Sequence, residues 1–284
     1  TLPTSTDITR EGYVFLGWYE SETPNENDSA VTTISTTAEG EKVYYAIWEI
    51  NEYTVVFMNG EEQEGSDQTV EYGKSAVAPI INKAGYTLSW SSAFTTTGIE
   101  GTTADYTNVT GDLTVTATWT ARNDTPYTIE YYKEDADTNT YVKANTVNKI
   151  GTTDTTATAE PKTYEGFTFN SEVKGTILSG TIAGDGSLVL KLYYTRNSYT
   201  VTFKNGEETV DTQTVKHGLS ATEPDVTLEK EGYTFTGWDA EFTEIVEDTT
   251  INAVWEINKY NVTFKDENGT QIGEVQVVEY EQDA

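Results

Sequence analysis

The chain has 284 residues, with 47 acidic and 17 basic side chains and a net charge of −30 at pH 7. This charge excludes nucleic acid as an expected partner, because phosphate binding needs a basic surface, and it disfavours direct contact with an anionic membrane. The chain has no cysteine and a single histidine, which excludes disulfides, thiolate metal sites, cysteine nucleophiles and any site that needs two histidines.

The remaining composition predicts a β-rich protein. Threonine is abundant, and the chain has 19 Tyr, 9 Phe and 6 Trp; β-branched and aromatic residues favour a half-buried pleated surface. So many aromatic residues are unusual for a disordered acidic chain. No apolar run reaches about 18 residues, so no membrane-spanning helix is expected.

Strand-like segments with a period of two follow one another along the chain. Segment 1–50 contains EGYVFLGWY from Glu11 and VYYAIWEI from Val43. Segment 51–122 contains YTVVFMNGEE from Tyr53, QTVEYGKSA from Gln68, AGYTLSW from Ala84 and LTVTATWTA from Leu113. Both segments end on the same type of strand.

The same order continues in the second half of the chain. Segment 123–196 contains YTIEYYKEDA from Tyr127, EGFTFN from Glu165 and LVLKLYYTR from Leu188. Segment 197–258 contains YTVTFKNGEE from Tyr199, QTVKHGLSA from Gln213, EGYTFTGWD from Glu231 and INAVWEIN from Ile251. Segment 259–284 restarts with YNVTFKDENG from Tyr260 and VQVVEYEQDA from Val275. Four strand types in a fixed order indicate tandem repeats.

These repeats predict a fold class of α+β, mostly β. Each β-grasp-like module has about four strands and at most one short helix, and the modules follow one another as an elongated rod. The expected domains are a partial unit (1–50), a divergent unit (51–122), units at 123–196 and 197–258, and the truncated start of another (259–284). Both ends are interpreted as cuts through a longer chain. Connections of a few residues require neighbouring units to touch or nearly touch.

Local signals refine this prediction. Asn59-Gly60 and Asn205-Gly206 predict hairpins with type I′ turns, and Gly237 predicts a bulge or a close backbone approach. GDGS around Gly184 predicts a hairpin turn between two strands. In the stretch 240–248, Phe242, Ile245 and Val246 have helical spacing, so either a short helix across the sheet or an irregular loop is expected.

Aromatic side chains are expected to form most of each small core. Each buries roughly 150–250 Å², and units of this size are close to the lower limit for an independent core. A minority interpretation makes some of them carbohydrate-stacking rings. The predicted core residues are Trp18, Trp48, Phe57, Tyr86, Trp119, Phe167, Phe169, Tyr199, Phe203, Tyr233, Phe235, Trp238 and Trp255.

The motifs EGYTFTGWD and INAVWE, preceded by YTVTFKNGEE and QTVKHG, resemble the Listeria–Bacteroides repeat, also called the internalin B-repeat. The resemblance covers 197–258 fully and 8–50 partly. It is looser in 51–122, where Trp90 is shifted in register, and its start returns in 259–284. Segment 123–196 resembles a MucBP-like unit. These resemblances imply a β-grasp fold in an extracellular bacterial protein of the cell surface or cell wall, and they offer no catalytic residues.

No catalytic, cofactor or metal site is predicted from the residues. His217 holds the place of Tyr72 in another copy, so it is interpreted as a strand end. Residues 135–139 resemble half of a calcium loop, but Thr140 and Thr146 replace the expected Gly and Glu, so a hairpin loop is favoured over weak calcium binding. A Lys–Asn isopeptide cross-link beside a buried acid stays open.

The function predicted from the sequence is a non-enzymatic stalk or spacer, with adhesion to a host or cell-surface protein or glycan as a further role. The chain is expected to be monomeric within a longer protein. A dedicated glycan or mucin receptor is the first alternative, and it requires exposed coplanar aromatic rings in a groove. Part of a surface hydrolase is the second, and it requires convergent carboxylates in a cleft.

Overall fold

The computed structural model describes residues 1–93 and 106–284, and in these ranges the regular structure consists of strands, with no helix. The chain forms two compact units. Unit 1 comprises residues 1–125, 152–154 and 183–186, and unit 2 comprises residues 126–151, 155–182 and 187–284. Each sheet lies inside one of the five sequence segments.

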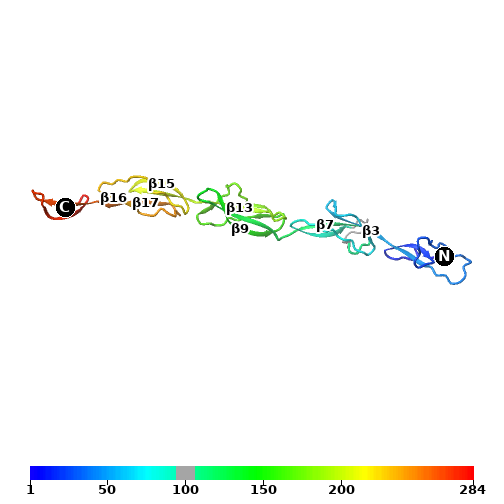
Figure 1. Cartoon of the computed structure of the whole chain (residues 1–284). Coiled ribbons are helices and arrows are strands. Elements are labelled where there is room, and N and C mark those ends of the chain that lie inside the picture. The colour runs from blue at the N-terminus through cyan, green and yellow to red at the C-terminus, as the bar shows by residue number, and fades with distance from the viewer. Residues whose placement is uncertain (94–105) are drawn as a thin grey trace. The chain divides into compact units, whose positions relative to one another are not determined.

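Unit 1 contains two sheets. In the first, β1 (Tyr13–Tyr19) pairs antiparallel with β2 (Tyr45–Ile50). In the second, β3 (Glu52–Asn59) lies in the centre, antiparallel to β4 (Glu62–Gln63) and β5 (Gln68–Glu71) on one side and parallel to β7 (Leu113–Ala121) on the other. The outer strand β6 (Tyr86–Ala93) is antiparallel to β7. Figure 1 shows β3 and β7 within this sheet.

In unit 2, the sheet of segment 123–196 has the order β11-β13-β8-β9. Its strands are β8 (Thr125–Glu134), β9 (Tyr141–Gly151), β11 (Phe167–Phe169) and β13 (Val189–Arg196), while β10 (Thr156–Thr158) and β12 (Ser179–Thr181) form a separate pair. The GDGS turn therefore does not join hairpin partners, because β12 pairs with β10 and not with β13 as expected.

Segment 197–258 has the order β15-β14-β17-β16, and β15, β16 and β17 are marked in Figure 1. The strands are β14 (Ser198–Asn205), β15 (Glu208–Lys216), β16 (Tyr233–Trp238) and β17 (Thr249–Ile257). Segment 259–284 supplies only the hairpin of β18 (Lys259–Lys265) and β19 (Gln271–Glu279). In segments 51–122, 123–196 and 197–258 the opening and closing strands are parallel neighbours.

Three separate cores lie on these sheets, one in each of segments 51–122, 123–196 and 197–258. Opening and closing strands contribute alternate residues: Val201, Phe203 and Ile251 are fully buried in the last core. Segments 1–50 and 259–284, in contrast, contain no fully buried side chain among the described residues. Each of these two segments has only two strands, which leaves one face of its sheet uncovered.

Of the two alternatives for 240–248, the structure has the irregular loop and not the short helix. Backbone groups of this stretch pair with the segment after β15: Ala221 N–H donates to Phe242 O at 2.8 Å, and Ile245 N–H donates to Leu219 O at 2.8 Å. Glu244 has φ +52°, outside helical geometry. Ile245 is still buried and Phe242 packs on the core, but Val246 is exposed. The spacing thus marked two of the three residues, Phe242 and Ile245, as inward-facing, while non-local backbone pairing formed the loop.

The bulge predicted at Gly237 is confirmed, because the β16–β17 register shifts between Phe235 and Gly237. The same shift occurs between Phe15 and Gly17. In β6–β7 the pairing from Tyr86 to Ala93 is continuous, so segment 51–122 lacks the extra residue. This explains the shifted register of Trp90: its ring still meets Phe57 edge-on at 5.2 Å, as Trp238 meets Phe203 at 4.9 Å.

The hairpins predicted at the two Asn-Gly pairs are present, although the turn differs from type I′. Asn59 and Asn205 pair across the strands, and only Gly60 and Gly206 have positive φ, at +64° and +63°. Positive φ at the first turn position alone is a feature of type II′. Each asparagine instead accepts an indole hydrogen bond from the closing strand: Trp119 Nε1 to Asn59 at 3.0 Å and Trp255 Nε1 to Asn205 at 3.1 Å.

Candidate functional site

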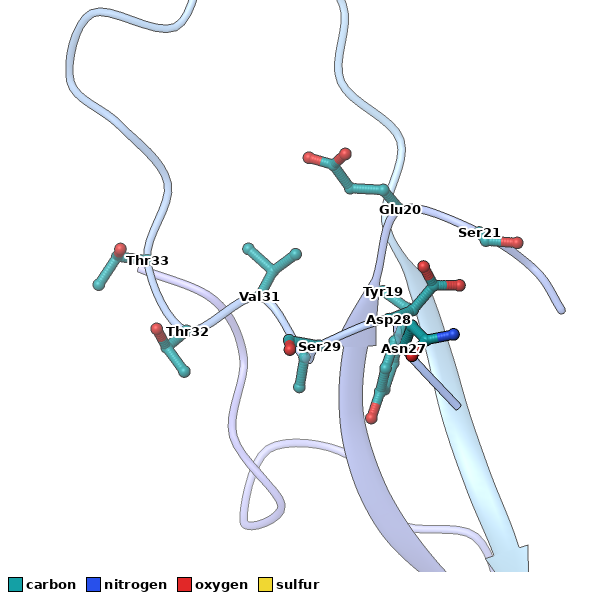
Figure 2. Close-up of a pocket in the computed structure, with 10 residues that line it drawn as sticks. Tyr19, Glu20, Ser21, Asn27, Asp28, Ser29, Val31, Thr32 and Thr33 are labelled. Carbon is teal, nitrogen blue, oxygen red and sulfur yellow. The ribbon is translucent and has the colours of Figure 1, made fainter. Parts of the chain in front are cut away.

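An open hollow of about 690 Å³ lies on segment 1–50. Figure 2 shows Tyr19, Asn27 and Asp28 close together at one side of it, with Thr32 and Thr33 further along the stretch of chain that follows Asp28. The Asp28 carboxylate accepts hydrogen bonds from the Asn25 backbone at 2.8 Å and side-chain amide at 2.9 Å. This carboxylate stabilises its own turn, so the hollow offers no pair of free carboxylates for acid–base chemistry.

A second hollow on the same segment, of about 640 Å³, is lined by apolar side chains that include Leu2, Phe15 and Trp18. In segment 197–258 the equivalent Trp238 packs edge-on against Phe203 of the opening strand. Segment 1–50 has no such strand in this chain. The hollow therefore corresponds to an uncovered half of a repeat core, and its shape alone does not indicate a ligand.

The outer face of the 123–196 sheet carries a cluster of tyrosines. Tyr132 and Tyr193 stack at 4.8 Å with planes 17° apart, and Tyr141 meets Tyr193 edge-on at 5.2 Å. The Tyr132 hydroxyl donates to Glu130 at 2.6 Å, and this hydrogen bond raises the pKa of Tyr132 to about 12. The rings pack against one another, and the Tyr132 hydroxyl is hydrogen-bonded to a neighbouring carboxylate. The rings lie on a sheet face.

A lysine, an asparagine and an acid, the combination that the sequence left open for a cross-link, lie together in unit 2. Lys216 Nζ donates to Glu134 at 2.7 Å and also to the Asn139 side-chain oxygen. Burial by itself would raise the pKa of Glu134, but hydrogen bonds from Lys216 and the Arg196 amide outweigh it and lower that pKa. Glu134 is therefore a carboxylate at neutral pH, paired with a lysine ammonium. This geometry is an ion pair between Lys216 and Glu134.

The loop at 135–139 is a hairpin connection between β8 and β9. One oxygen of Asp135 accepts hydrogen bonds from the Thr138 amide at 3.0 Å and hydroxyl at 2.8 Å, and Asn139 has φ +51°. This carboxylate thus holds the turn. Within the parts of the chain that the structure describes, no group of three or more acidic or histidine side chains could hold a metal ion.

The predicted aromatic core residues differ in burial. Phe57 and Phe203 are almost fully buried, and Phe167, Phe169, Tyr199 and Trp238 pack against the cores as partly buried side chains. The others are half-buried: Trp18, Trp48, Tyr86, Trp119, Tyr233, Phe235 and Trp255. Among these, Phe235 contacts Trp238 and Trp255, and the matching ring Phe15 contacts Trp18 and Trp48. Aliphatic residues such as Val55, Leu190 and Ile251, which the prediction omitted, are fully buried.

Two glutamines were missed as structural residues, although the repeated QTV motif contained the signal. Gln213 accepts a hydrogen bond from the Thr222 amide at 2.8 Å and donates to the Thr222 carbonyl at 2.6 Å. Gln68 makes the same pair with Val77, at 2.8 and 2.7 Å. Each glutamine therefore fastens the segment that follows the second strand of its repeat.

The comparisons with known proteins come from sequence families and from solved structures. Residues 1–47 and 199–254 match the Listeria-Bacteroides repeat domain. The chain thus carries tandem repeats, and the match to this family model falls within two of the five predicted segments. The MucBP-like interpretation of 123–196 stays a prediction.

A protein of Evansella cellulosilytica named as a Gly-rich membrane protein is 28% identical over 305 residues, covering 95% of this chain and 33% of that protein. A second protein of this organism, named as a membrane protein, is 40% identical over 91 residues, or 28% of this chain and 14% of its own length. The chain therefore spans about a third of the first relative. Across residues 1–93 and 106–284, no helix has the length and hydropathy to cross a bilayer.

Among solved structures, domains 3–4 of the Streptococcal High Identity Repeats in Tandem (SHIRT) from a cell surface protein are 20% identical. The match covers 47% of this chain and 98% of that one, with a TM-score of 0.21. A TM-score this low does not establish a shared fold.

Proposed function

We propose that this chain is a non-catalytic stalk segment of an extracellular bacterial surface protein, built from β-grasp-like repeats arranged as an elongated rod. The observation that carries the proposal is the connection between repeats. Only Asn51 separates β2 from β3, only Asn197 separates β13 from β14, and only Asn258 separates β17 from β18. Connections of one residue give successive sheets little freedom to fold back on one another.

The chemistry of the chain supports a mechanical role over a catalytic one. Three carboxylates at a hollow, a loop and a strand end accept hydrogen bonds from neighbouring backbone amides or from a lysine: Asp28, Asp135 and Glu134. The net charge of −30 disfavours self-association at low salt. Adhesion to a host or cell-surface ligand is proposed as an accompanying role.

Small-angle X-ray scattering on the intact 284-residue chain tests the proposal. A rod of consecutive repeats gives a radius of gyration well above the roughly 19 Å of one compact domain of this length, whereas a value near 19 Å would refute the stalk. Sedimentation measured in parallel should report a monomer. A glycan array distinguishes the receptor alternative, because saturable binding lost on Tyr132→Ala or Tyr193→Ala would favour it.

A further inference from the structure

Successive repeats in unit 2 are joined by a relay of two backbone hydrogen bonds. The Asn197 amide, between β13 and β14, donates to the Gly166 carbonyl at 2.9 Å. The Asn197 carbonyl in turn accepts from the His217 amide at 2.8 Å. The His217 ring then covers Gly166, so closely that a Cβ on Gly166 would lie 1.9 Å from the ring. Residues from three places in the sequence thus close one joint.

The same relay recurs at other joints, with a glycine, a connecting residue and a ring in the same roles. In the joint between 1–50 and 51–122 these are Gly12, Asn51 and Tyr72, and in the joint after β17 they are Gly232, Asn258 and Tyr280. The hydrogen bonds are 2.8 and 2.8 Å in the first, and 2.8 and 2.9 Å in the second. A Cβ would approach the ring to 2.1 Å at Gly12 and 2.0 Å at Gly232. Each glycine has φ between +72° and +77°, which glycine adopts without steric cost.

A glutamate before the glycine completes the contact where the ring is tyrosine. The Tyr72 hydroxyl donates to Glu11 at 2.7 Å, and Tyr280 makes the corresponding hydrogen bond to Glu231. A variant of this relay joins segments 51–122 and 123–196, and it has neither the glutamate nor the ring. There Ala84 precedes Gly85, Thr153 takes the place of the ring, and the Thr153 hydroxyl donates to the Gly85 carbonyl at 2.8 Å. In the joint at His217 the glutamate is kept, since Glu165 precedes Gly166, while the ring is histidine.

We propose that the positive-φ glycine and the ring that covers it form a docking contact, whose partner is the next repeat in the chain, and that this contact fixes the orientation of neighbouring repeats. One side of the contact is the Glu-Gly-aromatic motif at the third strand of a repeat. The other side is the ring of the residue after the second strand of the next repeat, which packs on the glycine. This inference rests on the proposed stalk function for its purpose, while the contact can be measured independently of it.

The test uses pairs of spin labels in the intact chain, which has no cysteine of its own. Labels at Leu16 in β1 and Thr87 in β6, both exposed, report on the joint at Tyr72. The parent chain should give a narrow distance distribution. Tyr72→Ala should broaden it at least two-fold, while Tyr72→Phe, which keeps the ring and loses the hydroxyl, should stay close to the parent width.

A glycine pair provides the matched control. Gly12→Ala should also broaden the distribution, because the new Cβ displaces the ring; Gly60→Ala has a similar φ of +64° but nothing within 4 Å, and should leave the width unchanged. The double variant Gly12→Ala with Tyr72→Ala should be no broader than the single ones. Equal widths in the parent, Tyr72→Ala and Gly12→Ala, with unchanged circular dichroism, would overturn the docking contact. A compact scattering profile would instead refute the stalk, so the two failures are distinguishable.

Discussion

Replacing Gln213 by alanine should loosen one repeat in a predictable way. Its side chain makes two hydrogen bonds to the backbone of Thr222, at 2.6 and 2.8 Å. Each such bond contributes about 0.5–1.5 kcal/mol net. Thr222 is exposed, so water can replace the lost partner, and we expect a total cost of about 1–2 kcal/mol, in the lower part of the summed range. This corresponds to a loss of protection of roughly 5–30-fold.

Amide hydrogen exchange followed by NMR on the intact chain measures this effect. The slowest amides of β14 and β15 should exchange faster by that factor in Gln213→Ala. Amides of segment 51–122, fastened by Gln68, should keep their rates and serve as an internal control. Gln276→Ala, on exposed β19, is the matched substitution. Equal exchange in Gln213→Ala and Gln276→Ala would refute the argument that the glutamine fastens the repeat.

Three further outcomes are expected. Because the pKa of Glu134 is lowered in the folded state, its contribution is present above the unfolded value of about 4.3 and is lost as pH falls through the lower folded pKa; acid-induced opening of the joint at His217, followed by exchange, should lose this dependence in Glu134→Gln. The pKa of Tyr132, raised to about 12 by its hydrogen bond to Glu130, stabilises the fold below about pH 10 and loses that contribution as pH rises through about 12; Glu130→Gln should move the Tyr132 ¹³Cζ titration toward 10, and an unchanged midpoint would contradict the assignment. The intact mass of the purified chain should equal the sequence mass, and loss of one ammonia, abolished by Lys216→Arg, would show that Lys216 and Asn139 are cross-linked after all.

The sequence by itself determined the repeats, the order of their strands and most hairpins, because alternating apolar residues and Asn-Gly pairs are local signals. It also marked Phe242 and Ile245 as inward-facing. It could not determine the backbone path of 242–245, since the same spacing suits a helix and a loop. The choice depended on hydrogen bonds to 219–221, which are distant in sequence.

Only the tertiary structure decided what the repeated polar and glycine residues do. The glutamine of QTV, the asparagine of Asn-Gly and the glycine of Glu-Gly-Tyr were visible as recurring letters. Their partners, such as Thr222 for Gln213 and Tyr72 for Gly12, lie in other strands or in the next repeat. A sequence period indicates which face a residue occupies, whereas the contact it makes depends on which segments the folded chain brings against that face.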